Sequence, residues 1–223
     1  LANGFETIET LTQDASSMVQ KVTAGAGNPV QALGRYALKR GLGGLNFTLG
    51  IPGTVGGALR MNAGAWGSCM ADTTQTVTLL NTKGDIVSKK RQDLRFRYRG
   101  LDLEEGELIL RGEFALKRID RDVLRKEAAQ MQKKRMANQP LREPSAGSIF
   151  RNPEDMSAGE LIEKAGLKGL RLGDAQISQK HANFIVNKGC AKAVDVISLM
   201  EQIQQTVFQR FGIQLEPEVI IVG

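Results

Sequence analysis

Apolar and polar positions alternate in short runs near the start of the chain. Residues 7–11 and 19–24 each have the two-residue period of a half-buried strand. After a break that contains glycine, the apolar positions recur at helical spacing up to a stop at Gly41. We therefore expect two strands followed by a helix, with Asn28 as its N-cap and Pro29 as its first residue.

The middle of the chain predicts further strands and then a long helix. Residues 75–80 and 85–88 flank a turn and indicate a hairpin, and residues 107–117 indicate a longer strand. Charged residues become frequent after this strand, where Asp120 can cap a helix that runs to about Ala137.

The last third of the chain mixes the two patterns. Ser157 has the spacing of a capping box before a short helix that Gly166 ends. Residues 182–187 indicate a strand, residues 196–211 a long amphipathic helix and residues 215–222 a final strand. Strands and helices occur without the regular alternation of a parallel sheet, which favours the α+β class.

The length and the apolar pattern limit the domain organisation. A chain of 223 residues can form two modest domains, and we place their boundary along the long helix, which gives domains of residues 1–118 and 119–223. No apolar run approaches the length of a bilayer span, so we expect no membrane partner. Two cysteines are too few for a disulfide framework and fit a reducing cytoplasm.

The chain is basic, with 30 Lys and Arg against 24 Asp and Glu and a net charge of +6. Aromatic residues are scarce and are not interleaved with the basic ones, so we expect no nucleic-acid partner. A small anionic ligand accounts for the positive charge equally well. The single histidine, His181, is interpreted as structural and leaves little room for a metal site, and we expect none.

Glycines are densest between residues 41 and 67. Residues 50–58 read GIPGTVGGA, and residues 62–65 read NAGA. Glycines let backbone N–H groups come close to a phosphate or a flat ring. The segment lacks the Gly-Lys-Ser/Thr of a P-loop and the clean fingerprint of a dinucleotide fold. Its spacing alone leaves a ligand cradle and a tight structural turn equally open.

A short segment alternates basic and aromatic side chains. As a strand, it would place Arg95, Arg97 and Arg99 on one face and Phe96 and Tyr98 on the other. On this pattern alone, a solvated basic face is the preferred interpretation.

Two further candidates for chemistry lie in the second half of the chain. Ser148 follows Gly147 in a turn and lacks the surroundings of a nucleophilic serine, which leaves the roles of turn residue and proton donor. Glu216 and Glu218 share one face of the predicted final strand, so their spacing does not choose between them.

Together these segments resemble the UDP-N-acetylenolpyruvoylglucosamine reductases (MurB), and in particular the shorter-chain subgroup of that family. The resemblance covers nearly the whole chain from about Val22 onward, and its blocks occur in the family's order. The blocks are residues 51–58, 61–65, 96–99, 144–153, 180–187 and 215–219. The resemblance implies the C-terminal part of a PCMH-type FAD-binding domain, followed by a smaller α+β substrate-binding domain.

The resemblance also implies a reaction. The family uses FAD and NADPH to reduce the enolpyruvyl ether of a UDP-sugar to a lactyl ether. We therefore expect a cytoplasmic oxidoreductase of peptidoglycan precursor synthesis, and through that pathway a role in cell wall biogenesis, cell shape and cell division. NADPH would reduce the flavin and leave, after which the flavin would deliver hydride to C3 of the enolpyruvyl group.

Residue roles follow from the same resemblance. Arg99 would bind the substrate carboxylate, and Arg99 and Glu218 together would meet the negative charge that develops there. Ser148 would give a proton to C2. Without the resemblance, Asn152 would be interpreted as a turn residue. Arg135 is as readily a helix-surface charge as a pyrophosphate contact. The expected substrate contacts are Tyr98, Arg135 and Asn152. The expected FAD contacts are Ile51, Pro52, Gly53, Thr54, Gly56, Gly57, Ala58, Asn62 and Gly64.

The chain departs from the family pattern at three points. The Gly-Gly-Gly-Ser-Asn-type loop, which holds the cofactor pyrophosphate in the family, does not occur in this sequence, so we expect weaker FAD binding. Leu101 stands where the family usually has serine, and Ile220 where it usually has arginine. Two alternatives remain: a non-catalytic fragment or pseudoenzyme that has lost FAD binding, and a different flavin oxidase with the same cofactor domain.

Overall fold

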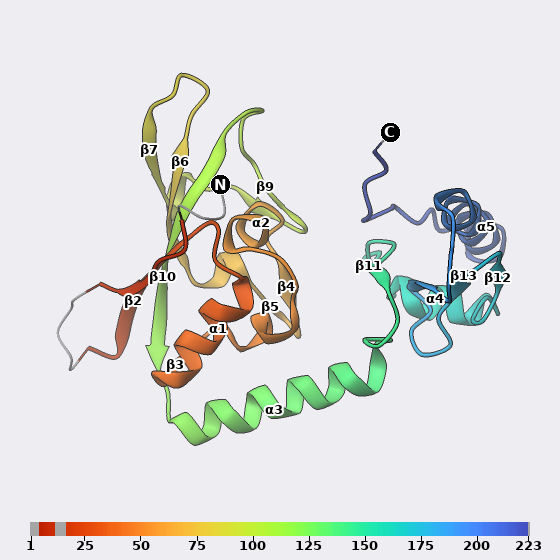
Figure 1. The fold of residues 1–223 in the computed structure, drawn as a ribbon, viewed down its shortest axis with the longest axis horizontal. Coiled ribbons are helices and arrows are strands. Elements are labelled where there is room, and N and C mark those ends of the chain that lie inside the picture. Colours follow the sequence, from red (N-terminus) through yellow and green to blue (C-terminus); the bar gives the residue numbers. More distant parts are fainter. Residues whose placement is uncertain (1–4, 12–16, 223) are drawn as a thin grey trace. The chain divides into compact units, whose positions relative to one another are not determined.

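The computed structural model describes residues 5–11 and 17–222, and it divides into two compact units, Leu1–Lys133 and Lys134–Gly223 (Figure 1). The division falls inside α3 (Arg121–Asn138), the helix along which the sequence predicts the boundary. The mixture of helices and sheets confirms the predicted α+β class.

The first turns of α3 belong to the first unit rather than to the second. Leu124 and Ala128 are buried, and the side-chain amide of Asn46 donates to the carbonyl oxygen of Leu124 at 3.2 Å. The same amide donates to the Glu127 carboxylate at 2.8 Å. These contacts explain why the first unit extends past residue 118.

Within the described residues, the first unit contains an antiparallel sheet of six strands in the order β1-β2-β10-β6-β7, with β3 beside β10. Helices α1 and α2 lie on the same side of this sheet (Figure 1). The sheet strands are β1 (Ile8–Thr10), β2 (Val19–Gly25), β3 (Leu42–Gly43), β6 (Thr74–Leu80), β7 (Ile86–Lys90) and β10 (Leu108–Arg118). The helices are α1 (Val30–Lys39), α2 (Val55–Arg60) and the short 3-10 turns η2 (Asn46–Gly50), η3 (Met70–Asp72) and η4 (Arg91–Asp93). Two small hairpins join β4 (Gly64–Ala65) to β5 (Ser68–Cys69) and β8 (Phe96–Arg97) to β9 (Gly100–Leu101).

Helix α2 packs closely on the central strand because that strand has a glycine at the contact. A Cβ on Gly112 would lie 2.9 Å from Cδ1 of Leu59 and 2.7 Å from the ring of Phe114. Leu59 and Phe114 are both fully buried. This contact fixes α2, and with it the glycine-rich loop that precedes α2, against the sheet.

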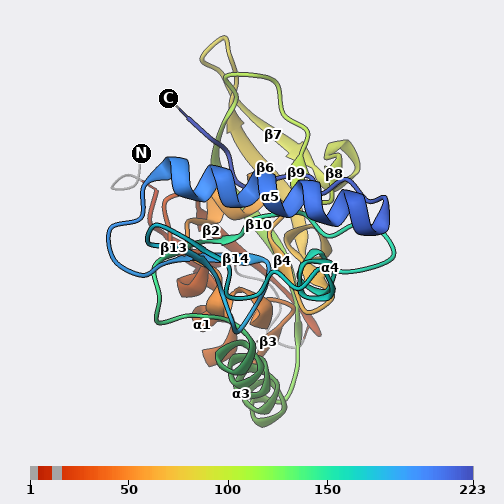
Figure 2. The same ribbon diagram turned by 90° about the vertical axis from the view of Figure 1, so that its right-hand side faces the viewer.

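The second unit contains a four-stranded antiparallel sheet within the described residues, in the order β11-β14-β13-β12. Helix α5 (Ala193–Phe211) packs against β12 and β13 (Figure 2). Its buried residues Leu199, Ile203 and Val207 share a core with α4. The other elements are β11 (Ser145–Ser148), α4 (Ala158–Lys164), β12 (Arg171–Leu172), β13 (Ala175–Ile177) and β14 (Phe184–Asn187).

Most predicted elements are confirmed within a few residues, and two predicted caps are observed. The Asp120 carboxylate accepts from the N–H groups of Asp122 and Val123 at 2.9 and 3.1 Å, at the start of α3. The Ser157 hydroxyl accepts from the N–H of Glu160 at 3.2 Å, at the start of α4.

The predicted cap of the first helix is wrong. Pro29 occupies the N-cap position of α1, and Asn28 lies one residue before it. The Asn28 amide donates instead to the carbonyl oxygens of Thr7 and Gly25, at 2.9 and 3.1 Å. A buried amide that can pair with the preceding strand has no reason to turn toward the helix.

The predicted strand with three arginines on one face is also wrong. The strand β8 stops at Arg97, and Tyr98 and Arg99 form the turn to β9. Arg99 has a φ of 55°, in the left-handed region, so it cannot continue a strand. Arg97 forms an ion pair with Asp102 at 2.8 Å, whereas Arg99 takes different contacts.

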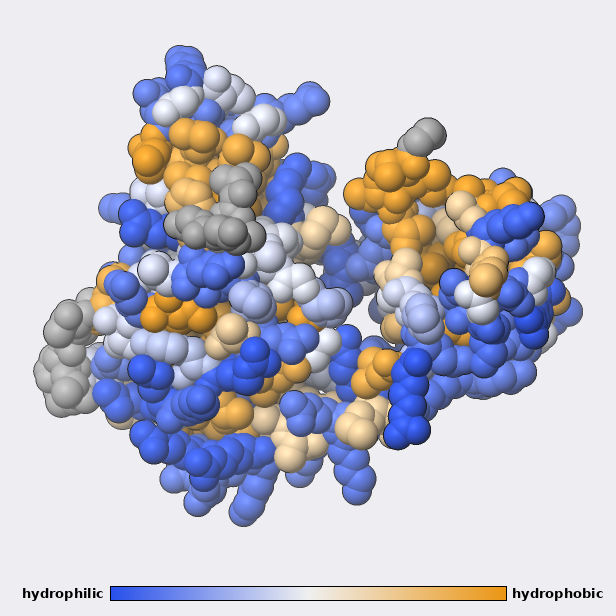
Figure 3. Space-filling view, in the orientation of Figure 1, coloured by the Kyte–Doolittle hydropathy of each residue, from blue (hydrophilic) through white to orange (hydrophobic). Residues whose placement is uncertain are grey.

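The predicted final strand reduces to a single bridge between Phe150 and Pro217. The N–H groups of Glu218 and Arg151 donate on either side of this bridge, to the carbonyl oxygens of Ile149 and Glu216, and no further strand pairing follows within the described residues. Beyond it the side chains of Ile220, Ile221 and Val222 are exposed, and they contribute to the hydrophobic surface beside the C-terminal end in Figure 3. The alternating apolar pattern of this segment therefore does not reflect burial.

Candidate active site

The loop before α2 presents an open backbone surface. Gly53 has a φ of 104°, and a Cβ built on it would meet no heavy atom within 4 Å. The Thr54 hydroxyl caps α2 by accepting from the N–H of Gly57 at 3.2 Å. The backbone N–H groups of Gly53 and Thr54 donate no hydrogen bond within the described residues. The loop therefore offers two accessible donors beside a position that has no side chain.

The loop is held in place by the turn between β2 and α1. The N–H of Gly56 donates to the carbonyl oxygen of Ala26 at 2.9 Å, and the N–H of Val30 donates to that of Gly53 at 3.0 Å. A Cβ on Gly56 would lie 2.9 Å from Cβ of Ala26, so only glycine permits this approach. Two small-residue segments thus lie side by side.

A cavity of about 400 Å³ opens beside these two segments. Thr54, Gly56 and Gly57 line it, as do Ala26 and Gly27. Of the other expected FAD contacts, Ala58 is buried in the core and Ile51 packs against the core. The open, backbone-lined surface around Gly53 fits a flat, phosphate-bearing cofactor such as FAD.

Two charged residues that line this cavity, Arg60 and Glu107, are not predicted from the sequence. Arg60 donates to the carbonyl oxygen of Leu101. Glu107 pairs with Lys89 at 2.8 Å, and the hydrogen bond from Lys89 holds the pKa of the Glu107 carboxyl below its ordinary value. Glu107 lies far from the glycine loop in the sequence, so no local pattern links it to the loop. Arg60 is the last residue of α2, the helix that follows the loop, and the sequence pattern does not single it out.

The side chain of Asn62 links the β8–β9 hairpin to η3. Its amide nitrogen donates to the carbonyl oxygen of Arg97 at 3.0 Å, and its amide oxygen accepts from the N–H of Ala71 at 3.0 Å. Arg99 donates to the carbonyl oxygen of Gly64 at 3.5 Å. An amide carries two N–H hydrogens, so a cofactor contact by Asn62 would use the second one.

Backbone strain is concentrated at the same place. Within the described residues, the non-glycine positions with positive φ are Asn62 at 41°, Trp66 at 59° and Arg99 at 55°. All three lie in or beside the β4–β5 and β8–β9 hairpins. Such conformations cost free energy and persist where the surrounding structure enforces them, as at functional sites.

Tyr98 and Arg99 form a pair at the tip of the β8–β9 hairpin. The guanidinium carbon of Arg99 lies 4.8 Å from the centre of the Tyr98 ring, a cation–π distance, and 53% of Tyr98 is exposed. The ring and the Gly64 carbonyl restrict the Arg99 side chain. A restricted guanidinium suits recognition of a carboxylate.

In the second unit the structure brings the Ser148 and Glu218 segments together. Ser148 ends β11 opposite Phe184 of β14, and Gly147 before it has a φ of 85°. The N–H of Glu218 donates to the carbonyl oxygen of Ile149 at 2.7 Å. Ser148 and Glu218 are both half-buried. Two predicted catalytic residues that are distant in sequence are therefore carried by directly bonded segments.

Asn152 lies next to α4. Its amide oxygen accepts from the N–H of Ala158, the first residue of that helix, at 3.0 Å. This bond holds the Asn152 side chain and leaves its amide nitrogen as the donor for a ligand.

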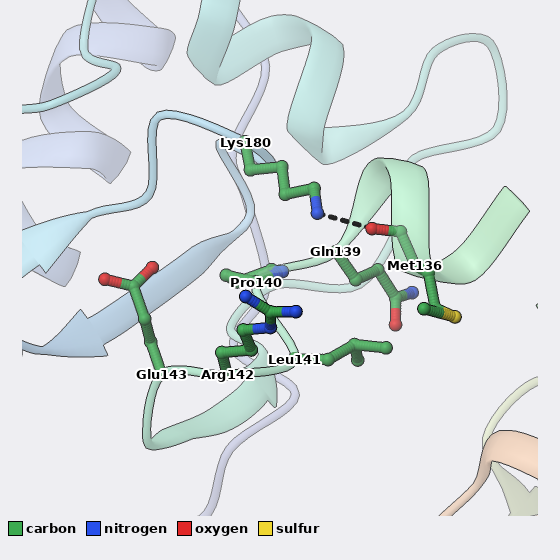
Figure 4. A pocket seen from close by; sticks show the side chains of 7 residues that line it. All are labelled: Met136, Gln139, Pro140, Leu141, Arg142, Glu143 and Lys180. Atoms are coloured by element: carbon green, nitrogen blue, oxygen red, sulfur yellow. Dashed lines mark hydrogen bonds between the residues drawn. The ribbon is translucent and has the colours of Figure 1, made fainter. Parts of the chain in front are cut away.

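Arg135 lies in the last turns of α3 and is followed by Met136, which lines a second cavity of about 460 Å³. Burial lowers the pKa of the Arg135 guanidinium, which nevertheless stays charged at neutral pH. Lys180 reaches the carbonyl oxygen of Met136 at the end of the helix (Figure 4). The amide oxygen of Gln139, which also lines this cavity, is buried without a hydrogen bond in the described residues.

Residues 5–11 and 17–222 form no cluster of metal ligands and no membrane-spanning helix. No three His, Cys, Asp or Glu side chains there are placed to share a metal ion. None of the helices in this part of the chain has the length and apolar character needed to cross a bilayer.

Comparison with known proteins gives the class of the molecule first. Residues 7–89 match an FAD-binding domain family, and residues 139–222 match the C-terminal domain of UDP-N-acetylenolpyruvoylglucosamine reductase. The chain thus combines an FAD-binding domain with the C-terminal domain of an oxidoreductase.

Whole-chain comparisons make the assignment specific. The chain is 42% identical over 222 residues to the UDP-N-acetylenolpyruvoylglucosamine reductase of Agathobacter rectalis, covering 98% of this chain and 71% of the relative. It is 46% identical over 203 residues to that of Syntrophus aciditrophicus, covering 91% of this chain and 65% of the relative. A crystal structure of UDP-N-acetylenolpyruvylglucosamine reductase from Thermus caldophilus matches with a TM-score of 0.79 at 38% identity, covering 93% of this chain and 73% of that one. The chain belongs to the UDP-N-acetylenolpyruvoylglucosamine reductase family, which confirms the resemblance seen in its motifs.

Proposed function

We propose that this chain catalyses the NADPH-linked, FAD-dependent reduction of UDP-N-acetylglucosamine enolpyruvate to UDP-N-acetylmuramate. The observation that carries the proposal is the hydrogen bond between Glu218 and Ile149, which ties together the segments of Ser148 and Glu218. A different flavin oxidase would have no reason to combine these two residues in a reductase C-terminal domain. The product of this reaction is a peptidoglycan precursor, and we propose that the activity is cytoplasmic.

The loop of the first unit would hold the cofactor. Gly53 and Thr54 provide backbone N–H donors, and Gly56 and Gly57 keep the surface free of side chains. The remaining contacts that the family resemblance implies are Ile51, Pro52, Ala58, Asn62 and Gly64. When bound, FAD supplies the hydride chemistry, while the protein supplies orientation and electrostatics.

Arg99 would bind the substrate carboxylate. Reduction of the enolpyruvyl group places negative charge on this carboxylate, and a permanently charged guanidinium stabilises the charge as it develops. The Tyr98 ring and the Gly64 carbonyl hold Arg99 before substrate arrives, so little reorganisation is needed. Tyr98 itself is exposed enough to contact the UDP-sugar.

Ser148 would move the proton. Its hydroxyl donates to C2 of the enolpyruvyl group once hydride has reached C3. Glu218 would act with Arg99 at the negative charge that develops on the substrate. Asn152 would donate a hydrogen bond from its amide to the UDP-sugar, and Arg135 would provide a positive charge for it.

Turnover separates this function from a pseudoenzyme of the same family. With added FAD and without oxygen, the chain should consume more than one equivalent of NADPH per flavin only when the enolpyruvyl UDP-sugar is present, and UDP-N-acetylglucosamine should not substitute for it. A pseudoenzyme would show no consumption that depends on the UDP-sugar. A chain that consumes NADPH equally well with either sugar would have a different activity.

Gly53→Ala should weaken FAD binding without a matching loss of fold. The new methyl group blocks the backbone surface, and loss of one hydrogen bond to a charged group costs ~1.5–3 kcal/mol, or about tenfold to a hundredfold in affinity. Titration with FAD, followed by quenching of flavin fluorescence, measures the change.

Gly84→Ala provides the matched control for backbone strain. Gly84 has a φ of 88° and open space around it, like Gly53, but it lies in the β6–β7 turn. Both variants should lose a similar ~1–2 kcal/mol of stability from the strained backbone. Equal loss of FAD affinity in the two variants would contradict the assignment of the Gly53 loop.

A further inference from the structure

Asn183 is a buried amide that binds the backbone immediately after Ser148. Only 3% of Asn183 is exposed. Its side-chain oxygen accepts from the N–H of Phe150 at 2.9 Å, and its side-chain nitrogen donates to the carbonyl oxygen of Phe150 at 2.8 Å. Its own carbonyl oxygen accepts from the N–H of Ile149 at 2.9 Å. Asn183 therefore binds both residues that follow Ser148.

Regular strand pairing does not fix this segment. The register between β11 and β14 shifts between Ser145 and Ser148, and Gly147 within that stretch has a φ of 85°. Ser148 is the last residue of β11. The side chain of Asn183 thus hydrogen-bonds to the backbone after Ser148, where the pairing between β11 and β14 has become irregular.

The backbone that follows Ser148 is also hydrogen-bonded to the Glu218 segment. The carbonyl oxygen of Ile149 accepts from the N–H of Glu218, and that of Glu216 accepts from the N–H of Arg151, at 2.7 and 2.9 Å. The backbone from Ile149 to Arg151 is thereby held by Asn183 on one side and by the Glu218 segment on the other.

His181 supports Asn183 in turn. Its Nδ1 accepts from the backbone N–H of Asn183 at 3.2 Å, and its ring lies 4.9 Å from that of Phe184 in an edge-to-face arrangement. A Cβ on Gly159 would lie 3.0 Å from the His181 ring, so a glycine at the start of α4 makes room for it. Packing and a hydrogen bond therefore restrict the backbone on which Asn183 lies.

We propose that Asn183 is the positioning residue for Ser148. It acts without contacting substrate or cofactor. Its role is to fix the backbone that carries the Ser148 hydroxyl. The inference rests on the proposed function, because it assumes that Ser148 gives the proton to the substrate. A displacement of about 1 Å at a reacting group can cost about 10²-fold in rate.

Two variants of Asn183 test the proposal in the chain loaded with FAD. Asn183→Ala removes both side-chain bonds to Phe150. Asn183→Asp keeps the acceptor but loses the donor, and it keeps the shape of the side chain. In stopped-flow measurements, reoxidation of the reduced flavin by the UDP-sugar should slow by about 10–10²-fold in both. Reduction of the flavin by NADPH should remain near the wild-type rate.

Asn187→Ala is the matched control at the other end of β14. The Asn187 side-chain oxygen accepts from the N–H groups of Gly189 and Ala191 at 2.9 and 3.0 Å, so this variant also removes two bonds to the backbone. A loss of stability without slowing of either half-reaction is expected. If this control slowed the UDP-sugar half-reaction as much as Asn183→Ala, or if neither Asn183 variant slowed it, the proposal would be overturned.

Hydrogen exchange gives a readout that needs no turnover. The amides of Ile149, Phe150 and Glu218 should exchange faster in the Asn183 variants, with no such change in Asn187→Ala. Unchanged exchange at these amides would contradict the proposal that Asn183 fixes the backbone after Ser148. A wild-type chain that binds FAD but never reacts with the UDP-sugar would refute the proposed function, and exchange alone would then decide whether Asn183 holds the segment.

Discussion

Ser148→Ala is expected to slow reoxidation of the reduced flavin by the enolpyruvyl UDP-sugar by about 10²–10⁴-fold, the usual cost of losing a general acid. Reduction of the flavin by NADPH should stay near the wild-type rate, because that half-reaction delivers no proton to substrate carbon. The substitution leaves Gly147 and its turn unchanged. Stopped-flow absorbance measures each half-reaction separately.

Ser145→Ala serves as the control for this prediction. Ser145 lies on the same strand, opposite Val186, and is exposed. Its loss should change neither half-reaction. Slowing of both half-reactions in Ser148→Ala would indicate a damaged flavin site, and normal rates in both would remove Ser148 from the mechanism.

Arg99→Ala should have the second largest effect, a loss of about 10²–10³-fold in the UDP-sugar half-reaction, as for the removal of one donor to a developing oxyanion. Arg99→Lys should recover only part of that loss, because an ammonium group cannot reproduce the planar fork of arginine. Lysine and arginine have the same backbone restrictions, so the strain at the φ of 55° is matched in that comparison.

Arg97→Lys is the control for the Arg99 variants. Arg97 is exposed and pairs with Asp102, which directly follows β9, and an ammonium group can keep such a surface pair. We therefore expect nearly normal rates. Equal damage from Arg97→Lys and Arg99→Lys would mean that the hairpin acts as a diffuse basic patch rather than through one guanidinium.

Local signals predict the long elements well. The strands near residues 19–24 and 107–117 alternate because one face of the sheet is buried, and alternation is visible in a single sequence. Asp120 and Ser157 are recognisable as caps because the bond that each accepts lies within three residues.

The failures arise where distant partners decide the local structure. Arg99 adopts a left-handed turn that a strand pattern cannot predict. Asn28 pairs with a preceding strand rather than with its own helix. The strand pairing around Pro217 is limited to one bridge, although the apolar pattern continues beyond it.

Much of the candidate site was predictable from motif resemblance rather than from spacing. The glycine loop, Ser148 and Glu218 were located by their motifs, although spacing could not choose between Glu216 and Glu218. The hydrogen bonds of Asn62 and Asn183 to distant backbone groups could not be found in this way. Such bonds depend on tertiary contacts, and an asparagine has no distinguishing local pattern.

Identification of the product is the decisive measurement for the proposed reductase activity. The chain is incubated with FAD, NADPH and UDP-N-acetylglucosamine enolpyruvate, and the nucleotide sugars are then separated and weighed by mass spectrometry. We expect a UDP-sugar heavier by two hydrogen atoms, formed in equal amount to the NADPH consumed. Absence of this product from a chain that holds FAD and whose flavin is reduced by NADPH would contradict the proposed activity.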